Sequence, residues 1–188
     1  MSEAFVYYKF YRIGQRIDEA RKEIVGRLEV ILKELDQLIK DAKREGVDPM
    51  QIDNMIMTYF EVQNVVDFAD KKLGYYSKLI VDMMRNAIQL LLLNKMCTFE
   101  DFERMPKEMD KEKALVECYK QNVVACRDIT KEFTDLREGE KVVEAIVLMP
   151  DATPLWLYVK SPPTIKQHPP PVEAVYEKCL GIKVRIDE

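Results

Sequence analysis

The sequence predicts a mainly α-helical fold: a four-helix bundle with a long first helix, followed by a small C-terminal β appendage, so that the class overall is α+β. Apolar residues recur at near-heptad spacing through the first 45 residues, and further amphipathic stretches continue to about residue 137. After Gly139 the composition changes to β-branched runs and prolines. We therefore divide the chain into a helical bundle, 1–138, and a β/extended appendage, 139–188.

The first helix is expected from about residue 3 to residue 45. Its apolar or small residues are separated by steps of three and four, which indicates one seam along the helix. Lys, Arg, Asp and Glu fill most of the intervening positions. The seam consists of Phe10, Ile13, Ile17, Ala20, Ile24, Leu28, Ile31, Leu35, Leu38 and Ala42.

Glycine and proline mark the ends of the next helices. Gly46 ends the first helix, and Asp48 with Pro49 begins a second, expected over 49–73. Gly74 then separates this helix from a third over 75–97. A capped turn at 98–104 precedes a fourth helix from about 106 to 137.

The C-terminal part reads as strands and turns. Strands are expected over 141–149 and 155–159, with a turn at 150–154 between them. Prolines make 161–171 an extended connector. A short helix over 171–180 and a last strand over 182–186 complete the chain.

Charge and composition narrow the class of protein. Lys and Arg number 29 against 33 Asp and Glu, a net charge of −4, and no segment is strongly basic, so nucleic acid is not a favoured partner. The most apolar stretch, 79–96, contains Asp82 and Arg85, which argues against a membrane span. We expect no signal peptide, because the first five residues lack a basic region followed by an apolar run. The four cysteines form no CxxC pair. We expect reduced thiols in a cytoplasmic protein.

The sequence contains few of the residues and motifs that enzymes commonly use for catalysis or metal binding. His168 is the single histidine and lies in the proline-rich connector. Glycine-rich phosphate loops, nucleophile elbows and zinc-ligand spacings are missing from the sequence. We therefore predict no catalytic, cofactor-binding or metal-binding residue and no cofactor. An enzyme that uses carboxylates alone remains an alternative.

Aromatic and proline-rich segments are the candidate partner-binding sites. Five aromatic residues lie close together at the N-terminus, where they can pack in a helical core, anchor a protein partner or stack on single-stranded nucleic acid. Proline-rich segments can dock into aromatic grooves, although they more often act as stiff connectors. The candidates are Phe5, Tyr7, Tyr8, Phe10, Tyr11, Trp156, Pro162 and Pro163.

The long first helix suggests the function. Second and third helices of about 25 residues would leave part of its seam exposed, unless another subunit covered it. We therefore expect a non-enzymatic scaffold or interaction protein that binds a second copy of itself or another protein subunit. The order of helices and β module is similar in outline to the GINS replication subunits, a resemblance that assigns no site residue. An accessory subunit of a nucleic-acid machine, replication-like or viral, is the corresponding alternative.

Overall fold

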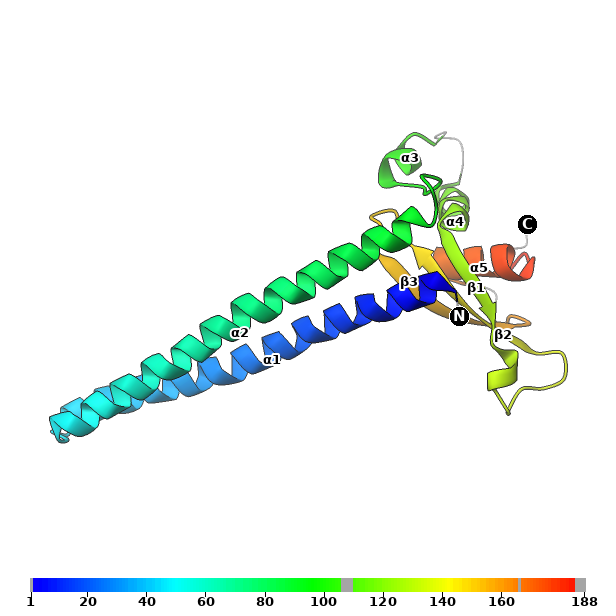
Figure 1. Ribbon diagram of the computed structural model, residues 1–188. Coiled ribbons are helices and arrows are strands. Elements are labelled where there is room, and N and C mark those ends of the chain that lie inside the picture. Colours follow the sequence, from blue (N-terminus) through cyan, green and yellow to red (C-terminus); the bar gives the residue numbers. More distant parts are fainter. Residues whose placement is uncertain (1, 106–109, 166, 185–188) are drawn as a thin grey trace. The chain divides into compact units, whose positions relative to one another are not determined.

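The computed structural model describes residues 2–105, 110–165 and 167–184, and it confirms the predicted class (Figure 1). The fold is mainly α, with two long N-terminal helices and a small C-terminal antiparallel sheet. The chain forms two compact units, Tyr11–Asp82 and Met1–Phe10 with Met83–Glu188. We call them the hairpin unit and the β unit.

The greater part of two helices of equal length makes the hairpin unit, and their outer ends belong to the β unit. Helix α1 spans Glu3–Arg44, as expected, and helix α2 spans Pro49–Leu90, each with 42 residues. Gly46, with φ +71°, lies in the tight turn between them. Figure 1 shows the two helices running antiparallel as a hairpin.

The predicted break at Gly74 is wrong, because α2 continues through it. The arginine stem from α1 packs beside this glycine, where a Cβ would lie 3.4 Å from Cδ of Arg21, an ordinary van der Waals distance. A single interior glycine weakens a helix by about 1 kcal/mol, which packing can offset. The expected overhang of α1 is therefore also wrong, since α2 has the same length.

The predicted fourth helix is helical only in its first part, up to Gln121. Thr98 caps a short helix α3, Phe99–Glu103, and helix α4 spans Lys111–Gln121. The predicted start near residue 106 lies outside the described residues. Beyond Gln121 the helical prediction is wrong, because the chain turns into a strand at Asn122.

Asn122 explains this turn through its buried side chain. Its Nδ2 donates to the carbonyl oxygen of Cys97 at 2.9 Å, and its Oδ1 accepts from the Cys97 backbone N–H at 2.7 Å. Its own carbonyl oxygen accepts from the Leu148 N–H at 2.9 Å. These non-local bonds fix Asn122 at the end of α4 and start the sheet.

The sheet is a meander in the order β1-β2-β3. Strand β1 spans Val123–Asp128, β2 Lys141–Leu148 and β3 Pro154–Ser161, with a short 3-10 helix η1, Thr130–Glu132, after β1. The predictions for β2 and β3 are confirmed. The third strand is β1, which lies before the predicted boundary at residue 138 and pairs with β2 after it.

The connector after β3 is shorter than expected. Residues 162–165 and 167–169 carry no regular structure, and Pro170 already begins helix α5, Pro170–Leu180. Residues 182–184 form no strand, so that part of the predicted last strand is wrong. Its remainder, 185–186, lies outside the described residues.

The core of the β unit lies on one face of the sheet. Val143, Ala145 and Val147 of β2 pack with residues of α4 and α5, including Tyr119 and Val175. Because side chains alternate along a strand, Glu144 and its neighbours on even positions face the other way. This second face holds the pocket described below.

Two disulfides correct the expectation of reduced thiols. Cys97 is bonded to Cys118, and Cys126 to Cys179, with Cα–Cα distances of 5.3 and 5.9 Å. The sequence reasoning placed Cys118 and Cys126 on one helix, whereas Cys126 lies on β1 and reaches α5. All four cysteines lie in the described part of the chain and none is free there.

Candidate functional site

Strand register brings three functional side chains into one row across the sheet. Arg127 of β1 pairs with Glu144 of β2, which pairs with Tyr158 of β3. Directly opposed residues of antiparallel strands project from the same face. Arg127, Glu144 and Tyr158 therefore lie together on the face opposite the core.

Glu144 is a buried acid with both oxygens engaged. Its side chain is 4% exposed, and Arg127 Nε donates to its Oε1 at 2.5 Å. Trp156 Nε1 donates to its Oε2 at 3.1 Å. A buried carboxylate needs such partners to remain charged, and this one has a cation and an indole N–H.

Arg127 links the sheet to the two walls of the site. Its guanidinium lies over the Phe5 ring, 5.8 Å from the centroid, and its Nη2 lies 3.5 Å from Oε1 of Glu132. Phe5 belongs to the first turn of α1, and Glu132 to η1. The guanidinium thus has a carboxylate on two sides and an aromatic ring on a third.

Aromatic rings line the other side. Tyr8 and Trp156 meet edge to face with centroids 5.4 Å apart, and Trp156 and Tyr158 lie 5.2 Å apart. Burial, and then the negative charge of Glu144, raise the pKa of the Tyr158 hydroxyl. Because the ordinary pKa of tyrosine is already about 10, this hydroxyl is protonated at neutral pH.

Together these groups surround a pocket of about 780 Å³. Small-molecule sites commonly occupy about 300–1,000 Å³ and are mostly apolar, as this one is. We call it the sheet pocket. Its lining includes Phe5, Tyr8, Lys9, Arg127, Ile129, Glu132, Phe133, Asp135, Leu136, Glu144, Trp156, Tyr158 and Lys160.

The structure separates the aromatic residues that the sequence grouped at the N-terminus. Phe5 and Tyr8 are buried and line the sheet pocket, where they meet Trp156. Tyr11 is buried, whereas Phe10 is 51% exposed. Tyr7 is partly buried and donates its hydroxyl to Glu3. Their role in binding a partner stays a prediction.

The proline-rich candidates lie elsewhere. Pro162 is exposed and Pro163 partly buried, directly after β3. Neither is among the residues that line the sheet pocket. Docking of this segment into a partner also stays a prediction.

The hairpin unit offers a second site, which begins with its internal seam. Buried and partly buried positions of α1 recur at strict steps of three and four, but they differ from most positions of the predicted seam. The observed seam is Tyr11, Gly14, Asp18, Arg21, Val25, Leu28, Leu32, Leu35, Ile39 and Ala42. The predicted seam is wrong at Phe10, Ile13, Ile24, Ile31 and Leu38, which are 43–51% exposed, and at the exposed Ala20. Sequence reasoning passed over the observed seam because a glycine and two charged residues belong to it.

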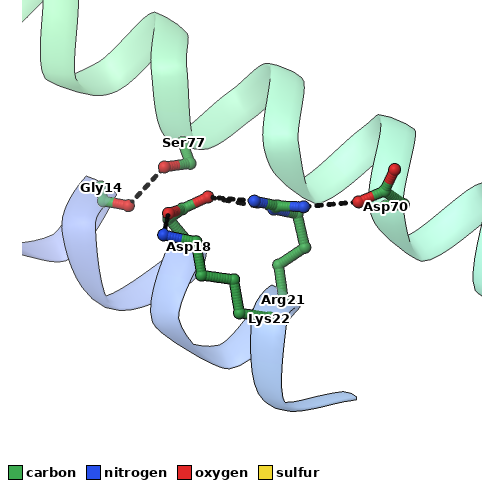
Figure 2. Close-up of polar contacts among 6 residues, drawn as sticks. All are labelled: Gly14, Asp18, Arg21, Lys22, Asp70 and Ser77. Carbon is green, nitrogen blue, oxygen red and sulfur yellow. Dashed lines mark hydrogen bonds and ion pairs between the residues drawn. The ribbon is translucent and has the colours of Figure 1, made fainter. Parts of the chain in front are cut away.

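Polar contacts fix how α1 and α2 pair, as Figure 2 shows. Arg21 bridges Asp18 at 2.8 Å and Asp70 of α2 at 2.5 Å. Ser77 donates its hydroxyl to the Gly14 carbonyl oxygen at 2.7 Å. The pKa of Asp18 is lowered by Lys22 and then by Arg21. These contacts define which residues of the two helices lie at the same height.

A second apolar row runs beside the seam of α1. Ile17, Ile24, Ile31 and Leu38 recur every seven residues, and Phe10 has the same spacing one heptad earlier. Ile24, Ile31 and Leu38 are 43%, 45% and 50% exposed. In a two-helix coiled coil without a further partner, the heptad position that flanks the seam usually carries a charged side chain.

Helix α2 carries matching side chains. Val65, Phe68, Tyr75 and Leu79 are 40–66% exposed. Because Arg21 meets Asp70 and Gly14 meets Ser77, the antiparallel register places Phe68 at the height of Ile24.

The two apolar rows lie on the same flank of the hairpin. Glu29 and Asp36 of α1 and Gln63 of α2 line one shallow hollow, which marks the polar flank. At about 100° per residue, the two apolar rows project to the other flank, whereas the exposed Met57 and Phe60 of α2 do not. We call this surface the apolar face. It consists of Ile13, Ile17, Ile24, Ile31 and Leu38 with Val65, Phe68, Tyr75 and Leu79.

Sequence reasoning missed Arg127, Glu144 and the α2 half of the apolar face. Arg127 lay in a predicted helix, so its pairing with a strand could not be expected. The α1 row was visible in the sequence as an apolar residue every seven positions from 10 to 38. A second row beside the first is the signal of a helix with more than one partner.

Comparison with known protein families, curated proteins and solved structures finds no match to this chain. Within the described residues, no group of three or more His, Cys, Asp or Glu side chains could hold a metal ion. Of the helices described, none combines the length and apolar character that crossing a membrane requires.

Proposed function

We propose that the protein is a non-enzymatic helical interaction protein that assembles with a second copy of itself through the apolar face, as a scaffold or a subunit of a larger assembly. The main support for the proposal is the row of apolar residues that recurs every seven positions beside the seam of α1. Exposed apolar residues on α2 match this row.

The pattern favours a bundle over an isolated hairpin. Helices that face one partner need two apolar positions per heptad, whereas core-facing helices of a bundle use about three. Along α1 the third position holds Ile17, Ile24, Ile31 and Leu38. Two hairpins joined by their apolar faces would supply four long helices, the arrangement of a four-helix bundle.

The area available supports a stable contact. A half-exposed large apolar side chain presents roughly 100 Å². The apolar face therefore offers about 800 Å² per copy, the amount that a standard interface buries on each partner. Exposed apolar patches of this size exceed those typical of monomers.

A second copy is the occupant that this geometry favours. Most oligomers are symmetric, and a two-fold axis brings the same patch of both subunits together. Both helices contribute exposed apolar side chains to the apolar face, so a rotated copy presents a surface of the same chemistry. Glu29, Lys33 and Asp36 lie on the opposite flank and would stay in water.

The test compares one charge on each flank. Ile24→Glu places a carboxylate in the apolar face, and Lys33→Glu places one at an exposed position on the polar flank. Sedimentation equilibrium should give a dimer or larger species for the wild type and for Lys33→Glu. Ile24→Glu should weaken association at least a hundredfold.

Phe68→Glu repeats the test from α2. Equal masses for all four proteins would refute the proposal. Circular dichroism shows whether each variant keeps the helix content of the wild type. If Lys33→Glu dissociates as readily as Ile24→Glu, the interface is not the apolar face.

The cytoplasmic location expected from the sequence is part of this proposal. The two disulfides bear on this location, because they must persist in the compartment where the protein is found. Disulfides persist mainly in oxidising compartments, although proteins of hyperthermophiles keep them inside the cell. Trapping thiols at the moment of lysis tests the location. Labelling of all four cysteines before reduction would contradict the disulfides in the cell.

A further inference from the structure

We propose that the sheet pocket binds a small, uncharged aromatic molecule. The sheet pocket lies within the β unit alone, so binding there is independent of self-association. The proposal depends on three properties of the pocket: the pairing of the charged groups, the arrangement of the aromatic rings and the size of the space.

The charged side chains that the three strands contribute to the pocket, Arg127, Glu144 and Lys160, already have partners of opposite charge. Arg127 holds the buried Glu144 and approaches Glu132, and Lys160 lies 3.1 Å from Glu140. Trp156 occupies the second oxygen of Glu144. A charged ligand would have to replace these contacts, whereas an uncharged one leaves them intact.

The aromatic rings supply the attractive surface. Tyr8, Trp156 and Tyr158 follow one another at centroid distances of 5.4 and 5.2 Å, and Phe133 adds a ring from the segment after η1. Aromatic groups gain edge-to-face or offset-stacked contacts in such a setting, beyond the burial of their area. This favours an aromatic ligand over an aliphatic one.

The space suits a small molecule. A volume of about 780 Å³ lies within the range of small-molecule sites, and the pocket is lined mostly by apolar atoms. The Tyr158 hydroxyl can donate a hydrogen bond without adding charge.

The sequence provides its own reporter, because Trp156 is the single tryptophan. The probe is phenylnaphthylamine, an uncharged aromatic fluorophore that accepts energy from tryptophan. Titration should quench Trp156 emission and give saturable, one-to-one energy transfer. Two charged analogues, naphthalene sulfonate and naphthylmethylammonium, should bind at least tenfold more weakly.

Two variants remove exposed parts of the pocket wall. Tyr158→Ala and Phe133→Ala change side chains that are 55% and 46% exposed, so the fold should tolerate both. Each should weaken probe binding at least fivefold. Phe99→Ala, at a 53% exposed phenylalanine of α3 outside the pocket, is the matched control and should bind as the wild type does.

Three results would overturn the proposal. One is probe binding that does not saturate or does not quench Trp156, and another is tighter binding of a charged analogue. The third is equal affinity of Tyr158→Ala, Phe133→Ala and Phe99→Ala. Thermal unfolding followed by circular dichroism, with a midpoint unchanged from the wild type, shows that a loss of binding is local.

Discussion

Arg21 of α1 and Asp70 of α2 form an ion pair of 2.5 Å at the seam of the hairpin, where the heptad pattern would place an apolar side chain. The pKa of Arg21 is raised, first by Asp18 and then by Asp70. Polar groups at seam positions lower stability but can select one register. This pair therefore determines which residues of α2 share a height with the apolar row of α1.

Loss of Arg21 should destabilise the hairpin more than loss of an arginine outside the seam. Arg21→Ala removes two ion pairs and the packing of its stem beside Gly74, and we expect a cost of about 1–2 kcal/mol. Arg27→Ala removes one pair with Glu23 at 78% exposure and should cost less than about 0.5 kcal/mol. Urea unfolding of both variants, followed by circular dichroism, measures the difference. Equal costs would show that the seam pair is no more important than a surface pair.

Two glycines of α1 should respond differently to alanine. Nothing lies within 4 Å of a Cβ at Gly26, so Gly26→Ala should stabilise the helix by about 1 kcal/mol. At Gly14 the new Cβ would lie 3.0 Å from methyl groups of both Ile80 and Val81, and this crowding should cancel the gain. Thermal unfolding distinguishes them, and an equal gain at both positions would mean that the helices are not in close contact at Gly14.

Acid should weaken the cluster around Asp18. The pKa of Asp18 is lowered by Lys22 and Arg21, so its ionised form stabilises the folded state at pH values above the unfolded pKa, about 3.9. This stabilisation is lost as the pH falls through the lower folded pKa. The wild type should therefore exceed Asp18→Asn in unfolding free energy at pH 6, with the difference vanishing at low pH. A difference that persists below about pH 2 would assign the effect to something other than charge.

The disulfides should stabilise the β unit. In the chain-entropy description, the bridge Cys126–Cys179, with a separation of 53, contributes about 4 kcal/mol, and Cys97–Cys118, with a separation of 21, about 3 kcal/mol. The double variant Cys126→Ser/Cys179→Ser should therefore unfold the β unit at lower denaturant, reported by Trp156 fluorescence. The variant Cys97→Ser/Cys118→Ser should have the smaller effect. Unchanged midpoints in both would show that the bridges do not form.

Local signals were enough to predict the ends of α1 and the strands β2 and β3. Gly46 and Asp48 with Pro49 mark the hairpin turn, and the run of β-branched residues after Lys141 marks β2. Each signal acts on neighbouring residues, so it can be read from sequence alone. The fold class depends on these signals and is confirmed.

Distant contacts explain what the sequence could not reveal. Asn122 ends α4 through bonds to Cys97, and the arginine stem from α1 lies against Gly74. The contacting residues are far apart in the sequence, so no local sequence pattern predicts these contacts. The sheet pocket was missed for the same reason, since Arg127, Glu144 and Tyr158 meet only through strand register.

The solution mass of the wild-type protein tests directly whether the chain self-associates. Light scattering on a sizing column, over a dilution series through the micromolar range, gives this mass without any label or variant. If the chain self-associates, the mass is twice the 22.1 kDa of one chain, or a higher multiple, and it falls on dilution. A single species of 22.1 kDa at every concentration would contradict self-association through the apolar face.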